Sequence, residues 1–119
     1  MFSVELYETV DGVSPVEEFF EVLRTTNPHL LSKTLRTVGL LEQYGNSLRE
    51  PYSKPLKGGI FELRATFGND TCRLLYFFRK DKIVIIDHGF IKKTNKTPIM
   101  DLNLAVQREK DYERRHRDE

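Results

Sequence analysis

Residues 56–98 have the sequence LKGGIFELRATFGNDTCRLLYFFRKDKIVIIDHGFIKKTNKTP, and this stretch decides the fold. It contains apolar, β-prone segments at residues 60–67, 72–79 and 83–90. The first two segments end in Gly68-Asn69-Asp70 and Lys80-Asp81-Lys82, and such residues favour hairpin turns. The pattern therefore predicts an antiparallel meander of three strands.

The residues before the meander predict one strand and two helices. Residues 2–9 alternate apolar and polar side chains at period two, which indicates a half-buried strand. Ser14-Pro15-Val16-Glu17 is a capping box with proline at the first helical position, so a helix should run from about Pro15 to Thr26. Asn27-Pro28 repeats this start signal, and a second helix should run from Pro28 to Tyr44 and stop at Gly45. The apolar positions of the two helices are Val16, Phe19, Phe20 and Leu23, then Leu30, Leu31, Leu35, Val38 and Leu41.

A last helix should begin near Thr97-Pro98 and run through Ala105 and Tyr112, and residues 113–119 are expected to fray. The order β-α-α-β-β-β-α predicts one α+β domain over residues 1–119. Two N-terminal helices and a C-terminal helix would surround a twisted, mainly antiparallel four-stranded sheet. We expect helices on one face of this sheet and a concave, partly open second face.

Positive charge is concentrated in the middle of the chain, although the formal net charge is only +1. Residues 1–48 hold three Lys/Arg against seven Asp/Glu, residues 49–96 hold eleven against five, and residues 97–119 hold five against six. Arg64, Arg73, Lys92 and Lys93 lie in or just after the predicted strands. A sheet that brings these cations together predicts a site for a phosphodiester or another polyanion.

The remaining composition excludes several classes of site. A single cysteine, Cys72, excludes a disulfide framework or a cysteine-rich zinc site. His29, His88 and His116 are far apart and lack the spacing of metal ligands, so we predict no metal and no cofactor. The chain has no apolar run of about 18 residues and no signal-peptide pattern. We therefore expect a cytoplasmic protein with no membrane partner.

Three motifs resemble a known family. LKGGIFELR at residues 56–64, CRLLY at residues 72–76 and HGFIKKT at residues 88–94, followed by Thr97-Pro98, resemble the RelE/HigB superfamily of bacterial toxins. Within it the closest resemblance is to the phage-derived Gp49-like branch, and it extends from the first strand to Tyr112. The resemblance implies the toxin of a type II toxin–antitoxin pair that cleaves mRNA in the ribosomal A site without a metal. It also implies a helix-turn-helix, HigA-like antitoxin that neutralises the toxin and connects it to operator DNA.

Metal-free RNA cleavage begins with attack of a ribose 2′-OH on the adjacent phosphate. It needs a base, cations for the phosphorane charge, and an acid for the leaving 5′-oxygen. Arginine suits the second task, because its planar fork holds two oxygens and it keeps its proton. Arg73 is our first candidate, with Arg64, Lys92 and Lys93 around the same phosphate.

The acid and the base remain open. Glu62 and Arg64 are two residues apart on one strand and point to the same face, so Glu62 is one candidate base and His88 another. The chain continues into a long helix where some relatives end in a catalytic tyrosine or histidine. The acid therefore remains open among Lys57, Lys92 and Lys93.

Each candidate also has an ordinary structural interpretation. Glu62 and Arg64 can form a simple ion pair, Arg73 can be an exposed strand arginine, and His88 can be buried with Val84, Ile86 and Phe90. The expected RNA-binding residues are Lys57, Lys54, Lys96, Arg79 and Tyr76, and Tyr76 has a core residue as its alternative. Two other functions compete with the nuclease. The protein could be a ParE-like toxin that binds a topoisomerase, or an inactive module that binds RNA or antitoxin.

Overall fold

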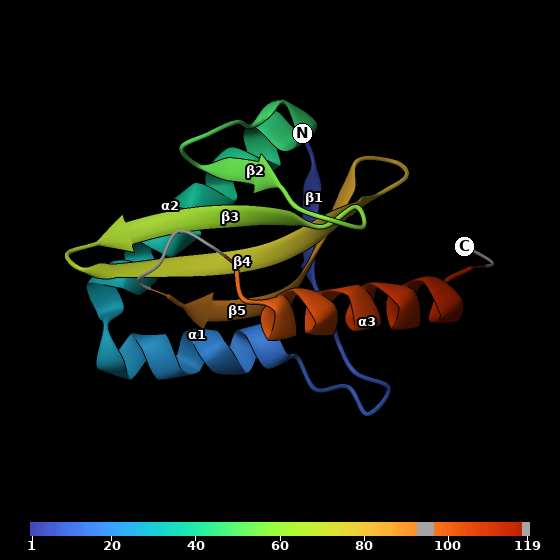
Figure 1. Ribbon diagram of the computed structural model, residues 1–119, viewed down its shortest axis with the longest axis horizontal. Coiled ribbons are helices and arrows are strands. Elements are labelled where there is room, and N and C mark those ends of the chain that lie inside the picture. Colours follow the sequence, from blue (N-terminus) through green and yellow to red (C-terminus); the bar gives the residue numbers. More distant parts are fainter. Residues whose placement is uncertain (93–96, 118–119) are drawn as a thin grey trace.

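The computed structural model describes residues 1–92 and 97–117 of the chain (Figure 1). Its elements are β1 (Ser3–Leu6), α1 (Pro15–Thr26), α2 (Pro28–Tyr44), a short 3-10 turn (Gly45–Ser47), β2 (Ser53–Pro55), β3 (Phe61–Phe67), β4 (Asp70–Arg79), β5 (Ile83–Ile91) and α3 (Ile99–Arg115). The predicted α+β class and element order are confirmed. The short strand β2, which lies in the loop after α2, is an addition to the predicted four strands.

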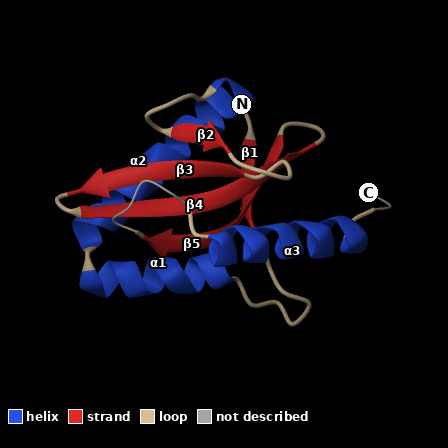
Figure 2. Ribbon diagram, viewed as in Figure 1, coloured by secondary structure: helices blue, strands red, loops and turns tan. Residues whose placement is uncertain are grey.

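The five described strands form one mixed sheet in the order β1-β5-β4-β3-β2 (Figure 2). Strands β3, β4 and β5 pair antiparallel, as the hairpin turns predict; β2 also pairs antiparallel with β3, and β1 pairs parallel with β5. Strand β4 is central, and β3 is covered on its outer side only by β2. Because β2 has three residues, much of the outer edge of β3 is left without a neighbouring strand.

The two N-terminal helices begin and end at the predicted residues. The Ser14 hydroxyl accepts a hydrogen bond from the Glu17 N–H at 3.2 Å, and the Asn27 side chain accepts one from the Leu30 N–H at 3.2 Å. These caps satisfy N–H groups that the first turn of a helix leaves free.

Among the described residues, no helix combines the length and the apolar composition needed to cross a bilayer.

Helices α1 and α2 cover one face of the sheet and close the larger core. Its buried residues are Val16, Leu23, Leu30, Leu31, Leu41, Leu63, Cys72, Leu74, Tyr76, Val84 and Ile86. Phe19, Phe20 and Val38 pack at its margin, whereas Leu35, expected on the apolar stripe of α2, is 46% exposed. The helical period places Leu35 beside the stripe, on the flank of α2 that the sheet does not reach.

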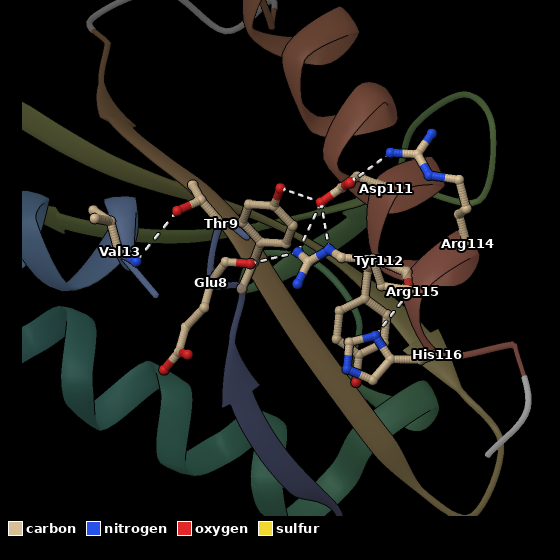
Figure 3. Close-up of polar contacts among 9 residues, drawn as sticks. Glu8, Thr9, Val13, Asp111, Tyr112, Arg114, Arg115 and His116 are labelled. Atoms are coloured by element: carbon tan, nitrogen blue, oxygen red, sulfur yellow. Dashed lines mark hydrogen bonds and ion pairs between the residues drawn. The ribbon is translucent and has the colours of Figure 1, made fainter. Parts of the chain in front are cut away.

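Helix α3 packs on the second face of the sheet, which we expected to be more open. In Figure 1, α2 passes behind the sheet and α3 crosses β5 on the viewer's side. Ala105 and Tyr112 of α3 form a second core with Tyr7, Ile60, Leu75, Phe77 and Ile85. The last turn of α3 is held by Arg115, which donates to Asp111 and to the backbone carbonyl of Glu8 (Figure 3). The helix therefore continues to Arg115 instead of fraying from residue 113.

A β-bulge changes which face His88 occupies. Tyr76 pairs with Ile86 and Leu75 pairs with His88, so Asp87 is an extra residue in β5. Beyond such a bulge the alternation of side chains shifts by one. Ile86 therefore belongs to the core under α1 and α2, while His88 lies on the α3 side. The expected grouping of His88 with Val84 and Ile86 is wrong for this reason.

The extra residue places a carboxyl group under α3. Asp87 is fully buried, and neither of its carboxyl oxygens has a hydrogen-bond partner in the described part of the chain. Burial raises the pKa of Asp87 to about 8; the nearby Arg108 opposes this rise and Glu109 adds to it. Burial likewise raises the pKa of Glu109. Asp87 is therefore mainly a neutral acid at pH 7.

The contact between α1 and β5 requires a residue without a side chain at position 89. A Cβ atom at Gly89 would lie 2.6 Å from the ring of Phe19 and 3.0 Å from the side chain of Leu74. Gly89→Ala should therefore lower the free energy of unfolding by about 1–3 kcal/mol, measured by urea denaturation. Gly39→Ala is the control, because no atom lies within 4 Å of that Cβ position in α2. It should leave stability unchanged or raise it by about 0.5–1 kcal/mol.

The raised pKa of Asp87 predicts a pH-dependent stability. Between pH 4 and about 8 the folded state keeps the proton that the unfolded state has lost, so stability should fall as the pH rises through this range. The slope from this one group is at most about 1.4 kcal/mol per pH unit. Asp87→Asn should remove it, so the stability advantage of the variant should grow from pH 5 to pH 8 in urea denaturation. Equal pH slopes for both proteins would contradict the assignment.

Candidate functional site

The register of β3 and β4 places two arginines side by side. Arg64 and Arg73 are directly opposed Cα partners, and Glu62 lies two residues before Arg64 on the same face. The Arg64 Nε donates to Glu62 Oε2 at 2.6 Å, and an Arg73 terminal nitrogen lies 3.4 Å from Glu62 Oε1. We call Arg64 and Arg73 the arginine pair. Glu62 and Arg64 lie on one face, as their spacing predicted, and the register adds Arg73 to that face.

A third group reaches the same carboxylate from outside the sheet. The Thr97 hydroxyl, just before α3, donates to Glu62 Oε1 at 2.6 Å. Both oxygens of Glu62 are therefore engaged, and the start of the α3 segment is tied to the arginine pair. Thr97 follows one of the motifs that resemble the toxin family, but no local pattern predicted its contact with Glu62.

The site carries one net positive charge in a mostly buried setting. The Glu62 side chain is fully buried, the Arg73 side chain is 3% exposed, and the Arg64 side chain is 24% exposed. A buried carboxylate requires opposite charge and hydrogen bonds, and the two guanidinium groups supply both. Arg64 and Arg73 both line an open hollow of about 380 Å³. The arrangement is suited to binding an anion.

His88 connects the sheet to α3. Its Nε2 lies 2.7 Å from Asp101 Oδ1, and its Nδ1 lies 3.5 Å from a terminal nitrogen of Arg108. Arg108 also donates to the backbone carbonyl of Asp87 at 2.7 Å, and the ring of His88 stacks on Phe90. Sequence reasoning missed Asp101 and Arg108, because nothing in the local pattern of α3 indicates that they meet β5.

The predicted lysines have different positions. Lys54 of β2 is the Cα partner of Glu62, so it lies beside the arginine pair, whereas Lys57 is exposed in the turn before β3. The Lys92 N–H donates to the Thr71 carbonyl at 3.0 Å, which continues the β4–β5 ladder past Ile91. Lys92 therefore lies next to the beginning of β4, near Arg73. Lys93 and Lys96 lie outside the described residues.

Two predicted RNA-binding residues lie away from the arginine pair. Tyr76 is 1% exposed, stacks against Phe61 in the core under α1 and α2, and shares a short hydrogen bond with Ser53. Its ring is therefore inaccessible to a nucleic-acid base. Arg79 lies at the opposite end of β4, where it donates to the His116 carbonyl and covers the ring of Tyr112.

Cys72 is also a core residue, as its place in the strand pattern indicated. It is 1% exposed, and burial raises the pKa of its thiol to about 11. Such a thiol is not a nucleophile at neutral pH. Within residues 1–92 and 97–117, no group of three His, Cys, Asp or Glu side chains is placed to hold a metal ion.

Comparison with known proteins identifies the family. No curated protein is significantly similar to the chain. The family model described as phage-derived protein Gp49-like (DUF891) matches residues 21–110, a range that runs from α1 into α3 and contains the arginine pair. This family is of the RelE/HigB toxin type, so the resemblance inferred from the three motifs is confirmed. The chain therefore belongs to the phage-derived Gp49-like family.

Proposed function

We propose that this protein is the toxin of a type II toxin–antitoxin module and that it cleaves mRNA on the ribosome. The family membership is consistent with a toxin and implies an antitoxin partner. The observation that carries the nuclease proposal is the arginine pair, held by Glu62 beside an open hollow. The partner in this proposal is a helix-turn-helix, HigA-like antitoxin, through which the complex contacts operator DNA.

The arginine pair matches the charge that develops during 2′-OH attack. A phosphorane carries its extra negative charge on nonbridging oxygens, and preorganised cations stabilise it without reorganising during the reaction. Arg73 enters the hollow from the central strand and Arg64 from the neighbouring strand, so two forks converge from one side. Lys92, beside Thr71, is the third cation in this proposal, and Lys54 extends the positive surface along β2.

Glu62 is better suited to orienting the arginines than to accepting a proton. Its side chain is fully buried and its two oxygens already accept from Arg64, Arg73 and Thr97. A general base must instead come within hydrogen-bond reach of the substrate hydroxyl. We therefore propose Glu62 as a positioning residue.

His88 is also more constrained than the sequence suggests. Its Nε2 bonds to Asp101 and its Nδ1 lies next to the Arg108 guanidinium, so both ring nitrogens already face residues of α3. We propose that His88 mainly fixes α3 to the sheet, and that Lys57, Lys92 or Lys93 supplies the acid–base function. The cationic site favours this nuclease over the ParE-like alternative, because a toxin that binds a protein does not need cations on the sheet face.

The direct test is primer extension on an mRNA in a cell-free bacterial translation system. With the protein added, cuts should appear only while the mRNA is being translated. The antitoxin, co-expressed with the protein, should abolish them. Intact mRNA together with blocked DNA supercoiling would select the topoisomerase alternative and overturn the proposal.

Arg73 provides the sharpest test of the mechanism. Arg73→Ala should lower the cleavage rate by about 10²-fold or more, because one preorganised donor to the developing charge is lost. Arg73→Lys should not restore it, since a lysine lacks the two-point fork. Arg24→Ala, an exposed arginine of α1, is the control and should cleave like the wild type. Circular dichroism and antitoxin binding check that each variant is folded. A fully active Arg73→Ala protein would contradict the assignment.

Glu62→Gln tests the positioning role separately. The variant removes a buried negative charge between two guanidinium groups, so unfolding free energy should fall by about 3–5 kcal/mol. Below its melting temperature the variant should bind RNA at least as tightly as the wild type, because the site gains one net positive charge. Its single-turnover cleavage rate should nevertheless fall, because the guanidinium groups of Arg64 and Arg73 lose the carboxylate that holds them both in place. Loss of RNA binding in the folded variant, or an unchanged cleavage rate, would exclude this role.

A further inference from the structure

The hollow beside the arginine pair extends past the edge of the sheet to α2. Its volume is about 380 Å³, and it is lined by Lys33, Thr37, Pro51, Tyr52, Arg64, Ala65, Thr66, Thr71 and Arg73. The β2–β3 ladder ends at the bond from the Arg64 N–H to the Tyr52 carbonyl, at 2.8 Å. Beyond this bond the hollow occupies the edge of β3 that β2 is too short to cover.

Cations from three elements of the fold line the hollow. Lys33 from α2, Arg64 from β3 and Arg73 from β4 contribute three cations, and no lining residue is a carboxylate. Lys33 is exposed, and in the described part of the chain it forms no ion pair. Lys33 is therefore available to a phosphate group.

The same hollow offers hydroxyl donors and an aromatic ring. The Thr66 and Thr71 hydroxyls lie 3.0 Å apart on neighbouring strands, beside the arginine pair. Tyr52 is 44% exposed at the rim, and its carbonyl is fixed by the bond to Arg64. Cations that follow a backbone, combined with an exposed aromatic ring, are the usual means of binding single-stranded nucleic acid. Strand pairing thus brings a ring and phosphate-binding groups to one place.

We propose that this hollow holds the RNA strand next to the cleaved phosphate, with Lys33 on a neighbouring phosphate and the ring of Tyr52 stacked on a base. The proposal rests on the proposed function and adds two residues, from α2 and from the loop before β2, that determine how the strand is positioned. The strand then runs from the arginine pair across the free edge of β3 to α2. Lys33 sets affinity through charge, and Tyr52 orients the strand through stacking.

The test is binding of a fluorescein-labelled, 2′-O-methyl RNA oligonucleotide, measured by fluorescence anisotropy over a series of salt concentrations. This probe cannot be cleaved by 2′-OH attack, so binding is measured independently of activity. Tyr52→Ala should weaken binding by roughly 10-fold or more, whereas Tyr52→Phe should retain it, because the ring and not the hydroxyl stacks. Lys33→Ala should weaken binding and reduce the slope of log affinity against log salt by about 0.7, the share of one phosphate contact.

Matched controls are available in the same part of the chain. Arg36 is an exposed cation one turn along α2 and does not line the hollow. Tyr44 is 47% exposed, close to the value for Tyr52, and also lies outside the hollow. Arg36→Ala and Tyr44→Ala should bind the RNA like the wild type. If these controls weaken binding as much as Lys33→Ala and Tyr52→Ala do, the binding is nonspecific and the proposal is wrong.

The remaining outcomes separate this inference from the proposed function. If the wild-type protein cleaves no mRNA but binds RNA through Lys33 and Tyr52, the nuclease proposal is refuted and the RNA-binding role of the hollow is supported. Wild type that cleaves during translation, with unchanged RNA affinity in both variants, supports the nuclease and refutes the hollow. If the two variants lose affinity for the purified antitoxin and not for RNA, the hollow is a protein interface and the proposal is overturned.

Discussion

The buried carboxylate of Glu62 is the interaction on which the site depends. It lies between the guanidinium groups of Arg64 and Arg73 and accepts a third bond from Thr97. Two arginines at opposed positions of neighbouring strands repel each other, and a carboxylate on the same face turns this repulsion into a fixed geometry. The carboxylate offsets one of the two positive charges, and both arginines line the hollow. The same bonds connect β3, β4 and the segment that begins α3, so the site and the packing of the C-terminal helix share one anchor.

The uneven cover of the sheet determines where that charge is accessible. Helices α1 and α2 close one face completely enough to bury Tyr76 and Cys72, and α3 covers the β4–β5 end of the other. Strand β2 is too short to protect the whole edge of β3, so Arg64 is partly exposed there while Arg73 lies buried beside it. A core on both sides makes the central strands rigid, and a rigid frame is what a preorganised cationic site requires. Membership of the Gp49-like family is consistent with such a frame serving a toxin.

The bulge in β5 adds a second constraint on α3. It turns both Asp87 and His88 toward the helix, where Asp101, Arg108 and Glu109 meet them. His88 forms a favourable pair with Asp101, while Asp87 remains a buried acid without a hydrogen-bond partner among the described residues. The contact between α3 and β5 therefore contains one hydrogen-bonded pair, His88 and Asp101, and one buried acid, Asp87, that stabilises the fold when it is protonated. Raising the pH through the pKa of Asp87 should therefore weaken the packing of α3 against β5.

The main helices and strands could be predicted from the sequence, because their signals are local. Capping residues fixed α1 and α2, turn residues fixed the meander, and the spacing of Glu62 and Arg64 placed them on one face. The motifs, which are also local, were sufficient for the family. The partners of Glu62, the face of His88 and the place of Lys33 and Tyr52 in the hollow could not be predicted in this way. These depend on strand register, on a bulge that adds one residue, and on a helix returning across the sheet. Such features arise from pairing between distant segments, and no pattern within one segment encodes them.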